Sequence, residues 1–158
     1  MSTLAEIYDF ETPIEAAFKT LLTDAGLTSK TSADEFDFQK TRPRVDIQFT
    51  INGANDSRRF TCPDGKFRHD LYSGTLTLAV VTNPRTVNGI VVTTHTAYRT
   101  AVRVAMSEAE SASLTDLEIR YVVPQSTTPR VTPEDGMEVS NLIYDVRFGI
   151  KPGSWPAV

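Results

Sequence analysis

One helix organises the chain, and it lies within residues 93–112, TTHTAYRTAVRVAMSEAESA. Its apolar side chains recur at steps of four and three, which places them on one face of a 3.6-residue helix. These residues are Tyr98, Val102, Ala105, Ala109 and Ala112. Alanine and valine dominate this face, and small side chains let a helix lie close against a sheet. We therefore expect the helix to pack on a β-sheet, between two β-rich halves of the chain.

A second helix is expected nearer the N-terminus, at Pro13–Ala25. Thr12 is a suitable N-cap, and proline is common at the first helical position. Gly26 is a natural stop, because glycine enters the left-handed conformation without a side-chain clash. Between these signals Ile14 and Phe18 begin an apolar stripe at helical spacing.

Alternation of apolar and polar residues predicts strands on both sides of the central helix. The clearest segments are 45–51, 71–82, 117–123 and 142–150, with a further β segment around 58–62 that resumes at Lys66. The order α-β-β-β-α-β-β predicts one α+β domain spanning residues 1–158. It has a mostly antiparallel sheet of about five strands and two helices packed on it.

Three segments lack a clear period or carry many turn residues, and we expect them to extend from the domain. They are an extended arm at 28–44, a projecting hairpin at 55–70 and an exposed loop at 124–138. The arm contains Phe36 and Phe38 within the acidic stretch ADEFDF. Two interpretations stay open: the rings pack back on their own domain, or the arm docks on a neighbouring subunit and buries them there.

Composition argues against several function classes. The chain has 158 residues and a formal charge of −4, whereas a surface devoted to nucleic acid normally needs a concentrated basic face. Cys62 is the single cysteine and cannot form an internal disulfide. There is neither an apolar run long enough to cross a bilayer nor a signal-peptide pattern, so secretion and membrane insertion are not expected.

No motif indicates catalysis, a metal or a cofactor. The sequence has no zinc-ligand spacing, EF-hand loop or phosphate-binding glycine loop. His95 stands near the start of the central helix, where an exposed polar residue is the simplest interpretation. A small enzyme or ligand-binding domain remains a rival hypothesis, with His69, His95 and Tyr98 as scattered candidates. We expect no enzymatic activity, no catalytic residues, no metal and no cofactor.

Arginines occur in three pairs: 42 and 44, 58 and 59, and 99 and 103. Surface ion pairs with acidic residues of the same chain are one explanation, and contacts with acidic patches on copies or partners are the other. Expected exposure nominates ten candidate interface residues: Phe36, Phe38, Arg42, Arg44, Arg58, Arg59, Arg99, Arg103, Arg130 and Trp155.

The order of these elements resembles the tail terminator (tail completion, or neck) proteins of long-tailed bacteriophages. The resemblance runs over roughly residues 14–150. It rests on PIEAAFKTLLTDAGL, on TRPRVDIQF after a polar arm, on LYSGTLTLAVVT, on the central helix THTAYRTAVRVAMS and on two closing strands.

The resemblance implies a non-enzymatic virion protein of the tail or neck, assembled in the host cytoplasm. Such a protein forms a homo-oligomeric ring, typically of six subunits, on the last ring of the tail tube protein. The ring stops tube polymerisation and docks on the head-tail connector protein, and DNA can pass through its lumen without sequence-specific binding. A head-completion or connector protein of the neck is the alternative within the virion.

Overall fold

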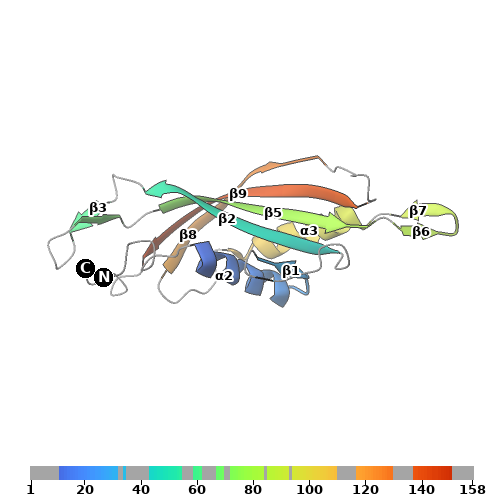
Figure 1. The fold of residues 1–158 in the computed structure, drawn as a ribbon, viewed down its shortest axis with the longest axis horizontal. Coiled ribbons are helices and arrows are strands. Elements are labelled where there is room, and N and C mark those ends of the chain that lie inside the picture. Colours follow the sequence, from blue (N-terminus) through green and yellow to red (C-terminus); the bar gives the residue numbers. More distant parts are fainter. Residues whose placement is uncertain are drawn as a thin grey trace.

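The computed structural model describes residues 11–31, 34, 43–54, 59–61, 67–69, 72–83, 85–92, 94–109, 117–129 and 137–150. These residues form a long five-stranded sheet with two helices on one of its faces and a small hairpin beyond each end (Figure 1). The helices are α2 (Glu11–Asp24) and α3 (His95–Met106). The strands are β1 (Ser29–Lys30), β2 (Arg44–Ala54), β3 (Arg59–Thr61), β4 (Phe67–His69), β5 (Tyr72–Thr82), β6 (Arg85–Val87), β7 (Ile90–Val92), β8 (Leu117–Thr127) and β9 (Glu138–Ile150).

The main sheet has the strand order β1-β2-β5-β9-β8. The pairs β2–β5, β5–β9 and β9–β8 are antiparallel, and only β1 runs parallel to its neighbour β2. The small strands pair as two antiparallel hairpins, β3–β4 and β6–β7. The expected α+β fold, with two helices on a mostly antiparallel five-stranded sheet, is confirmed.

The core lies between the sheet and the two helices. Alternate residues of the three central strands face the helices, as Leu76, Leu78 and Val80 of β5 do, and all three are fully buried. Helix α2 contributes Ile14 and Phe18 to the same core. Burying one such side chain contributes about 1.5–3 kcal/mol. A shift of one residue would expose every apolar side chain of a strand, so the period-two pattern determines which face of the sheet the helices cover.

The first turn of α2 is held by the sheet rather than by the expected cap. Thr12 lies inside the helix, which includes Glu11, so its prediction as the N-cap was wrong. The Glu15 carboxylate accepts a hydrogen bond from the Phe49 N–H (3.0 Å), and the Glu11 carboxylate accepts one from the Ile51 N–H (3.3 Å). Strand β1 pairs only with the first residues of β2, so the rest of that edge of β2, including these two N–H groups, has no neighbouring strand. The two carboxylates therefore satisfy backbone donors that would otherwise be unpaired.

Gly74 allows a close approach between β5 and an aromatic side chain of β2. A Cβ atom at this position would lie 2.2 Å from Cζ of Phe49 and 2.9 Å from the backbone oxygen of Thr50. The Phe49 ring meets Phe148 edge-on at a centroid distance of 5.8 Å, and Tyr72 stacks on the other ring at 5.5 Å. The absence of a side chain at residue 74 therefore leaves room for an aromatic cluster at one end of the core.

Two segments that were expected to lack regular structure contain parts of the sheet. The segment 28–44, expected as an arm, includes β1, whose residues Ser29 and Lys30 are buried, and it includes the start of β2 at Arg44. The segment 124–138, expected as a loop, begins with the last four residues of β8, because this strand continues through Pro124 to Thr127. Pro124 is tolerated because β8 is an edge strand and its register shifts between Pro124 and Ser126.

The hairpin β6–β7 was not predicted, although its turn has a recognisable sequence. Asn88 and Gly89 have φ angles of 51° and 77°. Positive φ at both central residues is the feature of a type I′ turn, for which Asn-Gly is the preferred pair. Gly26 also has the expected left-handed conformation (φ 83°), and it ends helix α2.

Helix α3 is shorter than the segment 93–112. It runs from His95 to Met106, and its buried face includes Val102, Ala105 and Met106 as the spacing predicts. Ala109 is buried just beyond the helix, whereas Ala112 lies outside the described residues. No helix in the described part of the chain is both long and apolar enough to span a bilayer.

Candidate functional site

His95 is completely buried, so its prediction as an exposed polar residue was wrong. Its ring links strands β5 and β9: Nδ1 lies 2.9 Å from Oγ1 of Thr82 and Nε2 lies 2.7 Å from Oγ of Ser140. The Thr82 hydroxyl also donates a longer hydrogen bond (3.5 Å) to the carboxylate of Glu138. This cluster fixes the start of α3 to β5 and β9.

The His95 cluster has the residue types of a hydrolase site but lacks the access that such a site needs. A serine nucleophile must reach a substrate carbonyl, and Ser140 is only 1% exposed. Hydroxyl groups both donate and accept, so the Thr82 and Ser140 hydroxyls can each hydrogen-bond one nitrogen of the imidazole ring. The cluster therefore acts as a structural clamp within the core, and the catalytic interpretation finds no support there.

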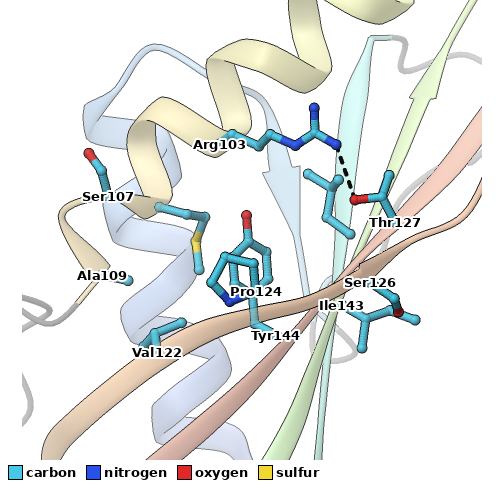
Figure 2. A pocket seen from close by; sticks show the side chains of 11 residues that line it. Arg103, Ser107, Ala109, Val122, Pro124, Ser126, Thr127, Ile143 and Tyr144 are labelled. Atoms are coloured by element: carbon cyan, nitrogen blue, oxygen red, sulfur yellow. Dashed lines mark hydrogen bonds between the residues drawn. The ribbon is translucent and has the colours of Figure 1, made fainter.

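A cavity of about 390 Å³ opens between the C-terminal half of α3 and strands β8 and β9 (Figure 2). Its inner wall is apolar and its mouth is polar. The wall includes Met106, Val122, Pro124, Leu142 and Tyr144, and the mouth includes Arg103, Ser107, Ser126 and Thr127. This volume falls within the range of sites that hold small ligands or anchoring side chains.

Tyr144 brings a polar group to the bottom of this cavity. The residue is 4% exposed, and its hydroxyl points toward α3 from beneath Arg103 (Figure 2). Burial raises the pKa of the Tyr144 phenol, and the positive charge of Arg103 opposes that shift in part. Among the described residues this hydroxyl has no hydrogen-bond partner, so it can donate to a bound acceptor.

Arg103 places a positive charge at the mouth of the cavity. Arg103 is exposed, and its guanidinium donates to the Thr127 hydroxyl at 3.1 Å. Arg99 stands one turn earlier on the same side of α3, and its buried Nε has no hydrogen-bond partner within the described ranges. Neither arginine forms an ion pair with an acidic residue in that part of the chain.

The other nominated interface residues do not gather at this cavity in the described structure. Arg44 is 5% exposed and pairs with Asp46 (Nε to Oδ1, 3.0 Å), which fits the intrachain explanation. Arg59 lies in β3, at the far end of the sheet from hairpin β6–β7 (Figure 1). The remaining nominations lie outside the described residues: Phe36, Phe38, Arg42, Arg58, Arg130 and Trp155.

The face of the sheet opposite the helices carries mainly polar and small side chains. Its rows across the strands include Gln48, Thr77 and Ile143, which register with one another. No described element packs on this face (Figure 1). Near one end Arg147 pairs with Asp145 (Nε to Oδ2, 3.3 Å), so charge there is compensated within the chain.

The described residues include no cluster of histidine, cysteine and carboxylate side chains that could hold a metal ion. A second hollow of about 450 Å³ lies along the β2 edge and is lined partly by Glu11 and Glu15. Both carboxylates already accept backbone hydrogen bonds there. The Arg103 cavity is therefore the candidate site with unused binding groups.

No protein-family model and no curated protein matches this chain. Among solved structures, its fold is similar to that of a chain in the structure described as "Virion of native gene transfer agent (GTA) particle". The TM-score is 0.55 at 12% sequence identity, and the match covers 87% of this chain and 92% of the other. At this identity the likeness shows a shared fold.

Proposed function

We propose that this chain is a non-enzymatic structural protein of a phage-like virion, and that it forms a ring that caps the tail tube. One observation carries the proposal: the fold is similar, over 87% of this chain, to a chain of a gene transfer agent virion. The match also covers 92% of that chain, so it concerns a whole subunit rather than a shared fragment. A similar fold does not fix function by itself, so the site and the surface must supply the rest of the argument.

The shape of the molecule suits a subunit of a closed ring. The sheet is long, both helices lie on one face, and the opposite face carries no described element (Figure 1). Such a sheet can form a section of wall, with the end hairpins placed to contact what lies above and below. Contacts between unlike surfaces of identical subunits generate a ring when the rotation between neighbours closes.

In this proposal the ring contains six subunits and sits on the last ring of the tail tube protein, where it stops polymerisation. Its other side docks on the head-tail connector protein. The hairpin in segment 55–70 and the segment between β8 and β9 supply contacts along the ring axis. DNA passes through the lumen, which needs no sequence-specific binding and agrees with a formal charge of −4.

A head-completion or connector protein of the neck is the second candidate, because the same likeness to a virion chain supports it equally. A small enzyme is disfavoured, since the best constellation for nucleophilic chemistry, around His95 and Ser140, is buried at 0% and 1% exposure. A ligand-binding role would use the Arg103 cavity, and the experiment below separates it from a virion role.

The first experiment measures the mass of the purified chain across a range of concentrations and images large species by negative-stain electron microscopy. The protein is then mixed with tail tubes from the particle that carries its gene. Rings bound at one tube end, with shorter tubes when the protein is added during polymerisation, support the terminator. Binding to isolated connectors without binding to tubes favours the neck alternative. Binding to neither contradicts a virion role at this position.

A further inference from the structure

We propose that the Arg103 cavity binds a small apolar molecule with a single carboxylate, of the kind that a medium-chain fatty acid provides. The inference goes beyond the proposed function and does not rest on it, because residues of one chain form the whole described lining. Three features define the ligand: an apolar wall, a buried hydroxyl without a partner in the described ranges, and one cationic side chain at the mouth.

The wall of the cavity favours an apolar body. Met106 and Leu142 are 5% and 2% exposed, and Val122 belongs to the same lining. A ligand that covers these side chains removes apolar surface from water on both sides of the contact, and this stabilises the complex. The unbranched Met106 side chain can adjust to the shape of the ligand, so the wall does not require one particular body.

The volume of the cavity sets the size of that body. At about 30 Å³ for each group the size of a water molecule, a cavity of about 390 Å³ holds roughly a dozen groups. Octanoate has about ten non-hydrogen atoms, so it would fill most of this space. The volume also lies within the range of about 300–1,000 Å³ that is typical of sites for small ligands.

Arg103 determines the charge of the ligand. It is the only charged residue in the described lining of the cavity, and its exposed guanidinium lies at the mouth. One of its hydrogen bonds goes to the Thr127 hydroxyl, and a guanidinium carries several N–H donors, so others remain for a carboxylate. Hydrogen bonds between a guanidinium and a carboxylate are charge-assisted and therefore stronger than neutral ones. A cationic ligand would be repelled, and a second anionic group would find no cationic partner in this lining.

Tyr144 offers a second donor deeper in the cavity. The residue is 4% exposed, its hydroxyl points toward α3 from beneath Arg103 (Figure 2), and that hydroxyl has no hydrogen-bond partner within the described ranges. Burial raises the pKa of the phenol above its ordinary value of 10.0, so the hydroxyl keeps its proton at neutral pH and can donate. A hydroxyl that has left water without a partner regains a hydrogen bond when a ligand oxygen accepts from it.

The two donors act on the same part of the cavity. The positive charge of Arg103 reaches the Tyr144 phenol, because it lowers the pKa that burial raises. A carboxylate has two oxygens, so one can accept from the guanidinium at the mouth and the other from the phenol beneath it. The apolar body can then extend along the wall that includes Met106 and Leu142.

Calorimetric titration of the purified full chain with octanoate at neutral pH tests the proposal. Octanoate should bind in a saturable manner, with one molecule per chain. Octanamide has the same length but no charge, so it should bind at least roughly tenfold more weakly. A lack of saturable binding at millimolar octanoate overturns the site, and equal affinity for the two molecules overturns the assignment of an anionic ligand.

Replacement of Arg103 tests the charged contact. Arg103→Met removes the charge but keeps an unbranched side chain, so it should weaken octanoate binding roughly tenfold and leave octanamide binding nearly unchanged. The matched control is Arg120→Met, since Arg120 is exposed on β8 and lies outside the cavity lining. Octanoate affinity that is unchanged in Arg103→Met, or that falls equally in both variants, overturns the proposed contact.

Tyr144→Phe separates ligand binding from stability. The change keeps the ring in the core and removes only the hydroxyl, so octanoate binding should weaken about three- to tenfold while Tm does not fall. Tyr121→Phe is the control on β8, because Tyr121 lies outside the cavity lining and donates to Asp145. Unchanged octanoate affinity in Tyr144→Phe, or a fall in its Tm without ligand, contradicts the proposed role of the hydroxyl.

Blocking the mouth locates the site and separates it from the function proposed above. Ser126 is exposed at the mouth, so Ser126→Trp should abolish octanoate binding without lowering Tm, whereas Ser126→Ala should bind as the unchanged chain does. Binding that persists in Ser126→Trp overturns the location. A chain that caps tubes but does not bind octanoate refutes the ligand site and leaves the terminator in place. A chain that binds octanoate but neither forms rings nor caps tubes refutes the terminator and leaves the ligand site in place.

Discussion

Replacing Gly74 by alanine should destabilise the chain, although alanine is the better residue for most strands. The added Cβ would lie 2.2 and 2.5 Å from two atoms of the Phe49 ring and 2.9 Å from the oxygen of Thr50. Ordinary contact requires about 3.5 Å or more, so the ring must move by more than about 1 Å. The space it would enter is already filled by Phe148, whose ring centroid is 5.8 Å away.

The expected magnitude follows from two opposing effects. Forcing an extra methyl group into a packed core costs about 1–3 kcal/mol, whereas replacing glycine within a strand gains about 0.5–1 kcal/mol by reducing the entropy of the unfolded chain. The net loss should be about 1–2 kcal/mol. For a chain of 158 residues, each 1 kcal/mol lowers Tm by about 2–4 °C, so Tm should fall by roughly 2–8 °C.

A double-mutant cycle with Phe49→Leu isolates the proposed cause. Leucine lacks the outer ring atoms that the new methyl group would meet, so Gly74→Ala should be nearly neutral in the Phe49→Leu background. The coupling free energy should then be about 1–2 kcal/mol. Thermal and urea unfolding are measured at one protein concentration, because assembly adds concentration-dependent stability. An equal loss in both backgrounds would refute the steric explanation, and Thr77→Ala on the outward face should change stability little.

Three further predictions concern polar contacts. Ser140→Ala should lower the free energy of unfolding by about 0.5–1.5 kcal/mol, because it removes the buried hydrogen bond between Nε2 of His95 and the Ser140 hydroxyl; a loss near zero in urea unfolding would contradict the clamp. Glu15→Ala should cost about 1.5–3 kcal/mol through the lost charge-assisted bond to the Phe49 N–H, and Glu15→Gln should recover part of it; equal losses would contradict a role of the acceptor oxygen. The pKa of Asp34 is lowered below its ordinary value of 3.8, chiefly by the hydrogen bond from a lysine ammonium, so its contribution to stability is present above that value and is lost as pH falls through the lowered pKa. Asp34→Asn should therefore destabilise the chain at pH 6, with a difference from the unchanged chain that shrinks in acid unfolding below pH 3.8; a difference independent of pH would contradict this.

The long strands could be predicted because one of their faces is buried. Strand β9 alternates between Leu142, Tyr144 and Val146 in the core and partly exposed residues opposite, and that alternation is visible in the sequence. Strand β1 has only two residues, which is too short to show a period. It exists because Ser29 and Lys30 pair with β2, a contact that no local pattern encodes.

The prediction for His95 was wrong because it considered only the position of the residue near the start of its own helix. Its partners Thr82 and Ser140 lie 13 and 45 residues away, and each sits in the inward-facing register of an otherwise apolar strand face. Polar residues in that register are a signal that something polar meets them across the core. The Arg103 cavity was harder to predict from the sequence. Its lining comes from the end of α3 and from strands β8 and β9, and register shifts between these two strands set which residues reach the cavity.

The two edges of the sheet bear on how copies of this chain can associate. On β2, carboxylates of Glu11 and Glu15 already occupy the N–H groups of Ile51 and Phe49. On β8, Pro124 lacks an N–H, and two register shifts interrupt the strand. Both edges therefore disfavour pairing with a strand of another copy. Such edge-to-edge pairing is the kind of contact that could continue from copy to copy without closing. The proposed ring would instead use side-chain contacts of fixed geometry between unlike surfaces.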